Sequence, residues 1–198
     1  MHLKYILFFL LLTGCGCIAG AQEAKQEQPA KKGCSCSFSS INQLGALAGS
    51  WGAGALLQSV NGFRYKTWFA GIGVGVDVYK RGTFPVFLDV RKDVFNARNT
   101  PFIYGEAGMH FPDKKIVSEG PWYESEYAGG FYSDAGIGYR VGKKGKSGFL
   151  ASAGYSYKYL TRVLQYKGAC GFGGCDNKMF SNYKYYLHRI SIKIGWQL

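Results

Sequence analysis

The chain of 198 residues has no apolar run as long as the ~20 residues that a transmembrane helix requires. The apolar stretch near its start covers only residues 5–12, and residues 71–76 are interrupted by three glycines. Proline and methionine are scarce, at 5 and 3 residues, and only 12 residues are acidic against 24 lysines and arginines. The lack of a long apolar run excludes a membrane protein built from helices.

Glycine and aromatic residues are abundant instead, with 29 Gly, 15 Tyr, 14 Phe and 4 Trp. This composition is typical of strands and turns, and it supplies aromatic side chains for the interfacial girdles of a membrane barrel. The net charge of +12 would suit nucleic acid, but an exported chain has little access to it. We therefore expect no nucleic-acid partner, and we expect anionic lipid or lipopolysaccharide phosphates as counter-charges.

Residues 1–21 have the features of a secretion signal: a short basic start, an apolar core and an A-x-A-like site at residues 19–21. Residues 12–15 (LTGC) also resemble the lipobox of bacterial lipoproteins, where cleavage would leave an acylated Cys15. Both alternatives export the protein. The polar, aperiodic residues 22–36 that follow predict a flexible periplasmic segment.

The six cysteines form three close pairs along the chain. Cys170 and Cys175 bracket a glycine-rich loop, which in an oxidising compartment predicts a small disulfide. A metal site is the rival interpretation, but only Asp176 accompanies this pair, so we expect no metal and no cofactor. The pairing of Cys34 and Cys36 stays open.

The final residues, 189–198, alternate without a break between polar and apolar side chains (RISIKIGWQL). A period of two indicates a β-strand with one apolar and one polar face. An alternating strand that ends near a Trp suits a membrane barrel, in which lipid-facing and lumen-facing residues alternate. A half-buried strand of a soluble sandwich shows the same pattern, so the rest of the chain has to distinguish the two.

Turn signals divide the chain after residue 36 into candidate strands. The eight predicted strands are 37–47, 53–64, 67–79, 84–95, 101–111, 129–141, 147–163 and 183–198. Asn61 and Gly62 would suit a hairpin turn, but a boundary there leaves an odd number of strands, so we predict a kink or bulge within one strand.

The connections differ in length in a regular way. Long polar loops at 112–127 and 164–182 follow the fifth and seventh strands, whereas the turns after even-numbered strands are short. Short periplasmic turns and long outer loops are typical of outer-membrane barrels. The sequence therefore predicts an all-β protein, an eight-stranded antiparallel up-and-down transmembrane β-barrel over residues 37–198, preceded by a signal peptide.

Residues 61–75 (NGFRYKTWFAGIGVG), 85–92 (PVFLDVRK), 101–104 (PFIY) and the closing strand resemble the small outer-membrane β-barrel proteins of Gram-negative bacteria, in particular those of the Bacteroidota. The resemblance covers about residues 37–198 and departs at Leu198, where such barrels commonly end in Phe. It implies export through the periplasm, insertion into the outer membrane by the barrel-assembly machinery and a monomeric barrel. It implies no established activity.

By the same alternation, eleven charged side chains face the lumen. They are Arg64, Asp77, Asp89, Arg91, Asp93, Glu106, Asp134, Arg140, Lys158, Arg189 and Lys193. Eight strands enclose only enough space for side chains, so these charges have to pair with one another. They predict a salt-bridged plug rather than an open pore or a catalytic cluster, and the glycines at 71, 73 and 75 are expected to leave room for bulky charged neighbours.

Two further function classes remain as alternatives to a structural or surface-interacting barrel. A lipid-modifying enzyme, a deacylase or acyltransferase, needs a His beside a Ser nucleophile. His188 and Ser191 are three residues apart and fall on opposite faces of a strand, which leaves only His110 with Asp113 and Ser118 as candidates. An adhesion module would act through the loops 112–127 and 164–182. We expect no catalytic residues.

Overall fold

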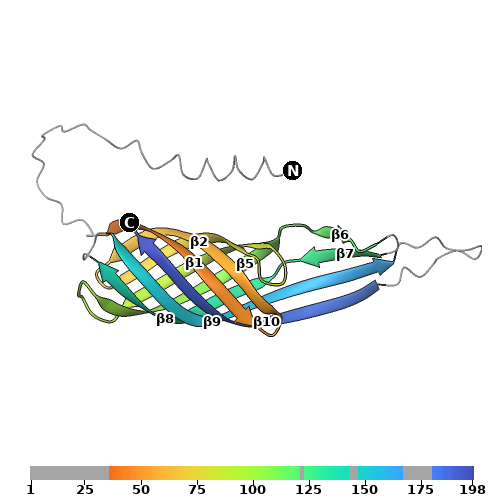
Figure 1. Cartoon of the computed structure of the whole chain (residues 1–198). Coiled ribbons are helices and arrows are strands. Elements are labelled where there is room, and N and C mark those ends of the chain that lie inside the picture. Colours follow the sequence, from red (N-terminus) through yellow and green to blue (C-terminus); the bar gives the residue numbers. More distant parts are fainter. Residues whose placement is uncertain (1–35, 121–122, 143–146, 167–179) are drawn as a thin grey trace, which may run out of the picture. The chain divides into compact units, whose positions relative to one another are not determined.

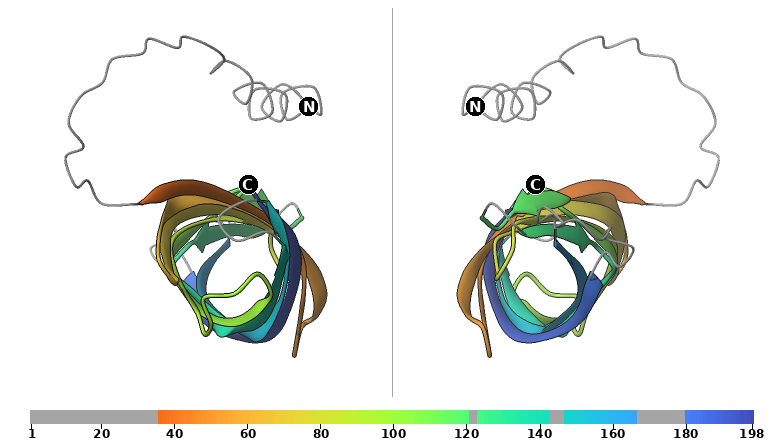
Figure 2. Two further views of the ribbon diagram at one scale, coloured as in Figure 1. Left: turned by 90° about the vertical axis from the view of Figure 1, so that its left-hand side faces the viewer. Right: turned by 90° about the vertical axis from the view of Figure 1, so that its right-hand side faces the viewer.

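The computed structural model describes residues 36–120, 123–142, 147–166 and 180–198. These residues form an all-β protein whose antiparallel sheet closes into an eight-stranded barrel. The strands run obliquely around the barrel axis (Figure 1), and the end-on views show a closed ring (Figure 2). The described residues include no helix of the length and apolarity needed to cross a membrane.

Each wall strand pairs with the next along the chain, and β10 closes the ring by pairing with both β9 and β1. The wall strands are β1 (Ser37–Gly49), β2 (Gly52–Tyr65), β3 (Trp68–Asp77), β4 (Thr83–Asp93), β5 (Thr100–Pro112), β8 (Phe131–Gly142), β9 (Gly148–Tyr166) and β10 (Phe180–Gln197). All eight predicted strands are confirmed, each end within three residues of its predicted position.

Alternation determines which face of each strand points inward. Along β10, Arg189, Ser191 and Lys193 are buried, whereas the isoleucines between them are exposed. The predicted kink or bulge at Asn61 and Gly62 is wrong, because the ladders of β2 with β1 and with β3 keep an unbroken one-to-one register through both residues. The two residues continue the strand.

The segment 112–127 was predicted only as a long polar loop, and the structure shows strands within it. This segment contains a hairpin of β6 (Ile116–Ser118) and β7 (Tyr123–Ala128), and β7 pairs with β9 beyond the point where β8 begins. Residues 123–128 alternate, with Glu124 and Glu126 on the face opposite the buried Ser125. That period of two was the available signal, but the strand is short and its partner is distant in sequence.

The two ends of the barrel therefore differ. At the short-turn end, β2 and β3 are joined by residues 66–67 and β4 and β5 by residues 94–99. At the opposite end, β6, β7, residues 161–166 of β9 and residues 180–184 of β10 form a four-stranded sheet that continues beyond the barrel wall (Figure 1). We call this the distal sheet.

Two apolar clusters lie inside the barrel. The larger contains Ile41, Val60, Phe69, Phe87, Phe102, Tyr104, Tyr132 and Leu150, and the smaller contains Leu47, Leu56, Tyr79 and Leu187. The space beside Gly73 is filled by the Phe87 ring and that beside Gly138 by the Phe102 ring. At these two glycines, the bulky neighbours are aromatic rather than charged.

Replacing Gly73 by Val should destabilise the folded barrel by about 1–3 kcal/mol, the usual effect of overpacking. A Cβ atom at this position would lie 2.4 Å from the Phe87 ring, so the ring would have to move within a filled interior. The free energy of unfolding in urea measures the effect. Ala70→Val on the outward face of the same strand is the control, and equal losses in both variants would contradict the packing argument.

Candidate functional site

The charged interior is the most chemically distinctive part of the molecule. The structure places all eleven lumen-directed charges inside the barrel, none more than 8% exposed, and they are all of the buried Asp, Glu, Lys and Arg among the described residues. Six are cations and five are carboxylates. They form three groups at successive depths between the short-turn end and the distal sheet.

The group nearest the short-turn end is centred on Asp93, at the end of β4. Its Oδ2 accepts hydrogen bonds from Arg64 Nη1 at 2.6 Å and from Arg140 Nη2 at 2.7 Å. Arg64 also donates to the side-chain oxygen of Gln197 on β10, at 3.2 Å. One carboxylate here joins cations from β2 and β8 across the lumen.

The middle group holds three carboxylates and two cations. Asp89 accepts from Arg91 Nη2 at 2.6 Å, and Lys193 Nζ lies 2.7 Å from Glu106 and 3.6 Å from Asp134. Neutral donors stabilise the carboxylates further. Gln58 and Tyr132 donate to Glu106, and Tyr104 donates to Asp134 at 2.7 Å.

The third group lies nearest the distal sheet and, unlike the middle group, holds more cations than carboxylates. Asp77, the last residue of β3, accepts from Lys158 Nζ at 3.0 Å and from Arg189 Nη1, and none of these three side chains is exposed. Thr83 accepts from Lys158 at 3.0 Å and Ser156 accepts from Arg189 at 2.7 Å. The outer groups therefore each carry one excess cation and the middle group one excess carboxylate.

His110 lies in the lumen at the end nearest the distal sheet, a position that the sequence analysis did not predict. It is 1% exposed, and its Nε2–H donates to the carbonyl of Tyr159 at 2.7 Å, whereas its Nδ1 is buried without a hydrogen-bond partner. Ser118 is exposed on β6, and no hydrogen bond or ion pair joins His110 to Asp113 or Ser118 in the described structure. The three residues form no catalytic arrangement.

The other candidate residues are also accounted for. His188 is exposed and Ser191 buried, so the two point to opposite sides of β10. Cys15, Cys34, Cys170 and Cys175 lie outside the described residues, as do the signal sequence and most of the loop 164–182. Within the described ranges, no group of three or more His, Cys, Asp or Glu side chains could hold a metal ion.

Cations and aromatic rings meet where the barrel joins the distal sheet. Lys80 Nζ lies 2.9 Å from the centre of the Trp51 ring and 3.6 Å from that of Tyr185. Burial, together with the charge of Arg162, lowers the pKa of Lys80 from its ordinary value. Arg81 lies over the Tyr127 ring at 4.4 Å, which links the β3–β4 connection to β7.

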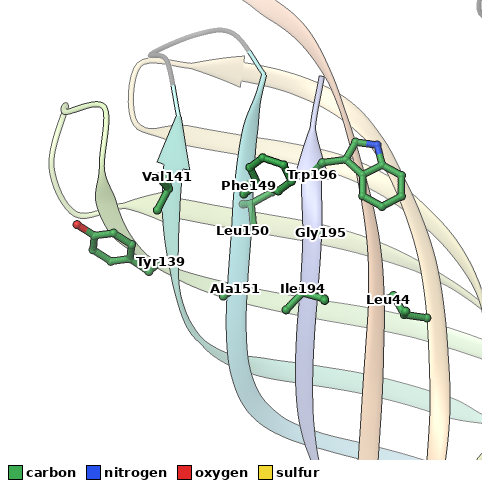
Figure 3. Close-up of a pocket in the computed structure, with 9 residues that line it drawn as sticks. All are labelled: Leu44, Tyr139, Val141, Phe149, Leu150, Ala151, Ile194, Gly195 and Trp196. Carbon is green, nitrogen blue, oxygen red and sulfur yellow. The ribbon is translucent and has the colours of Figure 1, made fainter.

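The outward surface of the wall is apolar. An open groove of about 450 Å³ lies on it near the short-turn end, where Tyr139, Phe149 and Trp196 surround the small Ala151 (Figure 3). Its floor is formed by β8, β9 and β10, and it contains none of the lumen charges. The residues that line it are apolar or aromatic apart from Gly195, and they include no catalytic group.

Comparison of the sequence with models of known protein families finds no match, and no curated protein matches it either.

Replacing Asp77 by Asn should cost about 3–5 kcal/mol of folding free energy, because Lys158 and Arg189 would remain buried side by side without their carboxylate. Urea unfolding followed by tryptophan fluorescence measures this loss. Glu126→Gln, at an exposed position of β7, is the charge-matched control and should change stability by less than about 0.5 kcal/mol. Equal stability of the two variants would show that the Asp77 group contributes no net stabilisation.

Proposed function

We propose that the chain is an outer-membrane β-barrel of structural or surface-interacting role, with a lumen filled by its own side chains and no open pore. The observation that carries the proposal is the inverted distribution of side chains. Leu88, Ile137 and Ile190 are 61–68% exposed on the outside, whereas Lys158 and Arg189 are at most 2% exposed inside. A protein folded in water has little reason for this arrangement, and a barrel in hydrocarbon requires it.

Aromatic side chains border this apolar surface at both ends, which supports the membrane setting. Those towards the short-turn end are Phe38, Phe63, Tyr65, Trp68, Tyr139, Phe149 and Trp196, and those towards the distal sheet include Trp51, Phe84, Phe111, Phe131 and Tyr186. Lys66 and Lys92 contact Tyr65 and Trp68 at the short-turn end. Their ammonium groups suit anionic lipid phosphates at that interface.

The filled interior supports a role other than conduction. The three ionic groups and two apolar clusters occupy the lumen from one end to the other, and eight strands leave little further space. The distal sheet is then the part available to the outside, since the longer connections of outer-membrane barrels are extracellular. Surface interaction through this sheet is the function that the geometry favours. Among the residues that the structure describes, no His–Ser pair supports the lipid-modifying alternative.

Electrophoresis of the membrane-extracted protein, with and without boiling, tests the barrel and its location together. We expect the unboiled protein to migrate faster and to fractionate with the outer membrane, because a closed barrel stays folded in detergent until heated. Recovery in the soluble fraction without a mobility shift would overturn the proposal.

Replacing the exposed Leu88 by Lys distinguishes a lipid-facing surface from a water-facing one. In a bilayer the substitution should cost about 2–4 kcal/mol, the penalty for a cation near the midplane. In water an exposed substitution changes stability by about 0.5 kcal/mol or less. Urea unfolding in lipid vesicles measures the difference, and Phe95→Lys in the turn after β4 is the control expected to be tolerated. A small effect at Leu88 would argue against the membrane.

A further inference from the structure

Three cations gather at the mouth of the barrel, where the β3–β4 connection approaches the distal sheet. Lys80 and Arg81 belong to that connection, and Arg162 belongs to the distal part of β9. Each of the three lies near aromatic rings. We call these cations and rings the mouth cluster, which consists of Trp51, Lys80, Arg81, Tyr127, Arg162, Tyr183 and Tyr185.

Alternation places the cluster on the face that continues the lumen surface. Arg162 pairs with Tyr127 on β7 and with Tyr183 on β10, and the same face of β9 carries the buried Lys158 nearer the barrel. Of the cluster, only Trp51 belongs to the aromatic border. The three cations are therefore reached through the mouth, whereas lipid head groups surround the outer perimeter of the wall.

Lys80 is positioned by an unusual backbone conformation. Its φ of 59° lies in the left-handed region, which glycine adopts more readily than lysine. Hydrogen bonds fix the chain on the N-terminal side, since Arg81 N–H donates to the carbonyl of Tyr79 at 2.6 Å and Tyr79 N–H donates to Asp77 at 2.8 Å. Strained conformations of this kind cluster at functional sites such as ligand clamps. Here the strain directs an ammonium group against two of the aromatic rings.

The cations of the mouth cluster exceed the carboxylates paired with them by two. Glu119, on the β6–β7 connection, accepts a hydrogen bond from Arg162. In the part of the chain that the structure describes, no ion pair joins Lys80 or Arg81 to a carboxylate. Burial, together with the charge of Arg162, lowers the pKa of Lys80, so the positive charges lie close enough to act on one another.

The surroundings add to this positive charge. Asp113 N–H donates to the carbonyl of Gly82, but Lys114 follows directly in the chain and offsets the carboxylate. The third ionic group of the lumen, with one excess cation, lies next to the cluster, because its Lys158 donates to the carbonyl of Tyr79 at 3.4 Å. Charges of one sign beside low-dielectric walls raise the local concentration of counter-ions. The mouth is therefore suited to an anion.

The three cations also have N–H groups to offer. Lys80 makes no hydrogen bond within the described ranges, Arg81 donates to one backbone carbonyl at 3.3 Å, and Arg162 donates to Ser125 and Glu119. Lysine carries three donors and arginine five. A phosphate monoester carries a charge of about −1.5 to −2 at pH 7 and three acceptor oxygens, which matches an excess of two cations. One carboxylate would neutralise only half of that excess.

We propose that the mouth cluster binds the phosphate group of a small soluble ligand, an inference that rests on the proposed surface role of the distal sheet. Lys80, Arg81 and Arg162 donate to the phosphate oxygens, and guanidinium groups bind such oxygens in pairs. The phosphates of lipopolysaccharide share this chemistry. The position of the cluster on the lumen face favours the soluble source.

Isothermal titration calorimetry of the protein in phosphatidylcholine nanodiscs tests the binding, with glucose 1-phosphate as the probe and glucose as its neutral counterpart. We expect heat from glucose 1-phosphate alone. Lys80→Met and Arg81→Met should each weaken its binding about tenfold, because each removes a charge-assisted hydrogen bond. Lys184→Met, at an exposed position on the opposite face of β10, is the control that should leave the affinity unchanged. No binding, or equal affinity in all three variants, would overturn the proposal.

The substitution Glu119→Gln distinguishes a binding site from contacts that only hold the connection against the sheet. It removes the carboxylate that competes for Arg162, so glucose 1-phosphate should bind about threefold more tightly. A gain in affinity cannot arise from a damaged fold. Weaker binding in this variant would show that the cluster is structural and would overturn the proposal.

Nanodiscs that also contain lipopolysaccharide distinguish the two sources of phosphate. An unchanged titration supports the soluble ligand, whereas loss of glucose 1-phosphate binding would show that lipid phosphates occupy the cluster and would overturn the soluble source. The boiled and unboiled mobilities of each preparation are compared as well. Coinciding mobilities contradict the barrel in the membrane, whereas a heat-modifiable barrel that binds no phosphate contradicts only the role of the mouth cluster.

Discussion

Closure of the sheet through the β1–β10 ladder is the constraint on which the rest of the structure depends. With eight strands joined in a ring, the lumen is about as wide as the side chains that fill it, and every inward position has to be packed or paired. Five carboxylates cannot remain in that space without cations beside them. The three ionic groups, the phenol and amide donors around them and the glycines opposite aromatic rings all follow from this limited volume.

Closure of the sheet also separates a charged lumen from an apolar outer surface by a single layer of backbone. A shift of one residue in any strand would turn its charges towards the outside and its isoleucines inward, so the register is strongly determined. In β10, for example, Lys193 reaches Glu106 in the lumen while Ile192 and Ile194 are exposed on the outer surface. Charged side chains are placed in the lumen and apolar ones on the outer surface in only one register, and this register therefore specifies the folded arrangement.

Much of the fold could be predicted from period two alone. The eight wall strands and the inward side of each follow from alternation, which is a local property of the chain. The pairing of Asp77 with Lys158 and Arg189 does not, because these residues lie on three strands and meet only after closure. The β6–β7 hairpin was missed because β7 depends on the distal part of β9 for its pairing. The inward position of His110 was not predicted, although the alternation that places Glu106 in the lumen also places His110 there.

The length of β9 and β10 has a mechanical consequence. Both strands run from the short-turn end of the barrel into the distal sheet, and their ladder continues from Gly148 opposite Gln197 to Gln165 opposite Phe180. A tensile force applied to the distal sheet along the strands would load many of these hydrogen bonds in shear at once, rather than opening them one after another. Tension is then shared with β8 and β1, which flank the pair in the wall. Pulling on the distal sheet would therefore meet the resistance of the whole wall rather than that of a single strand pair.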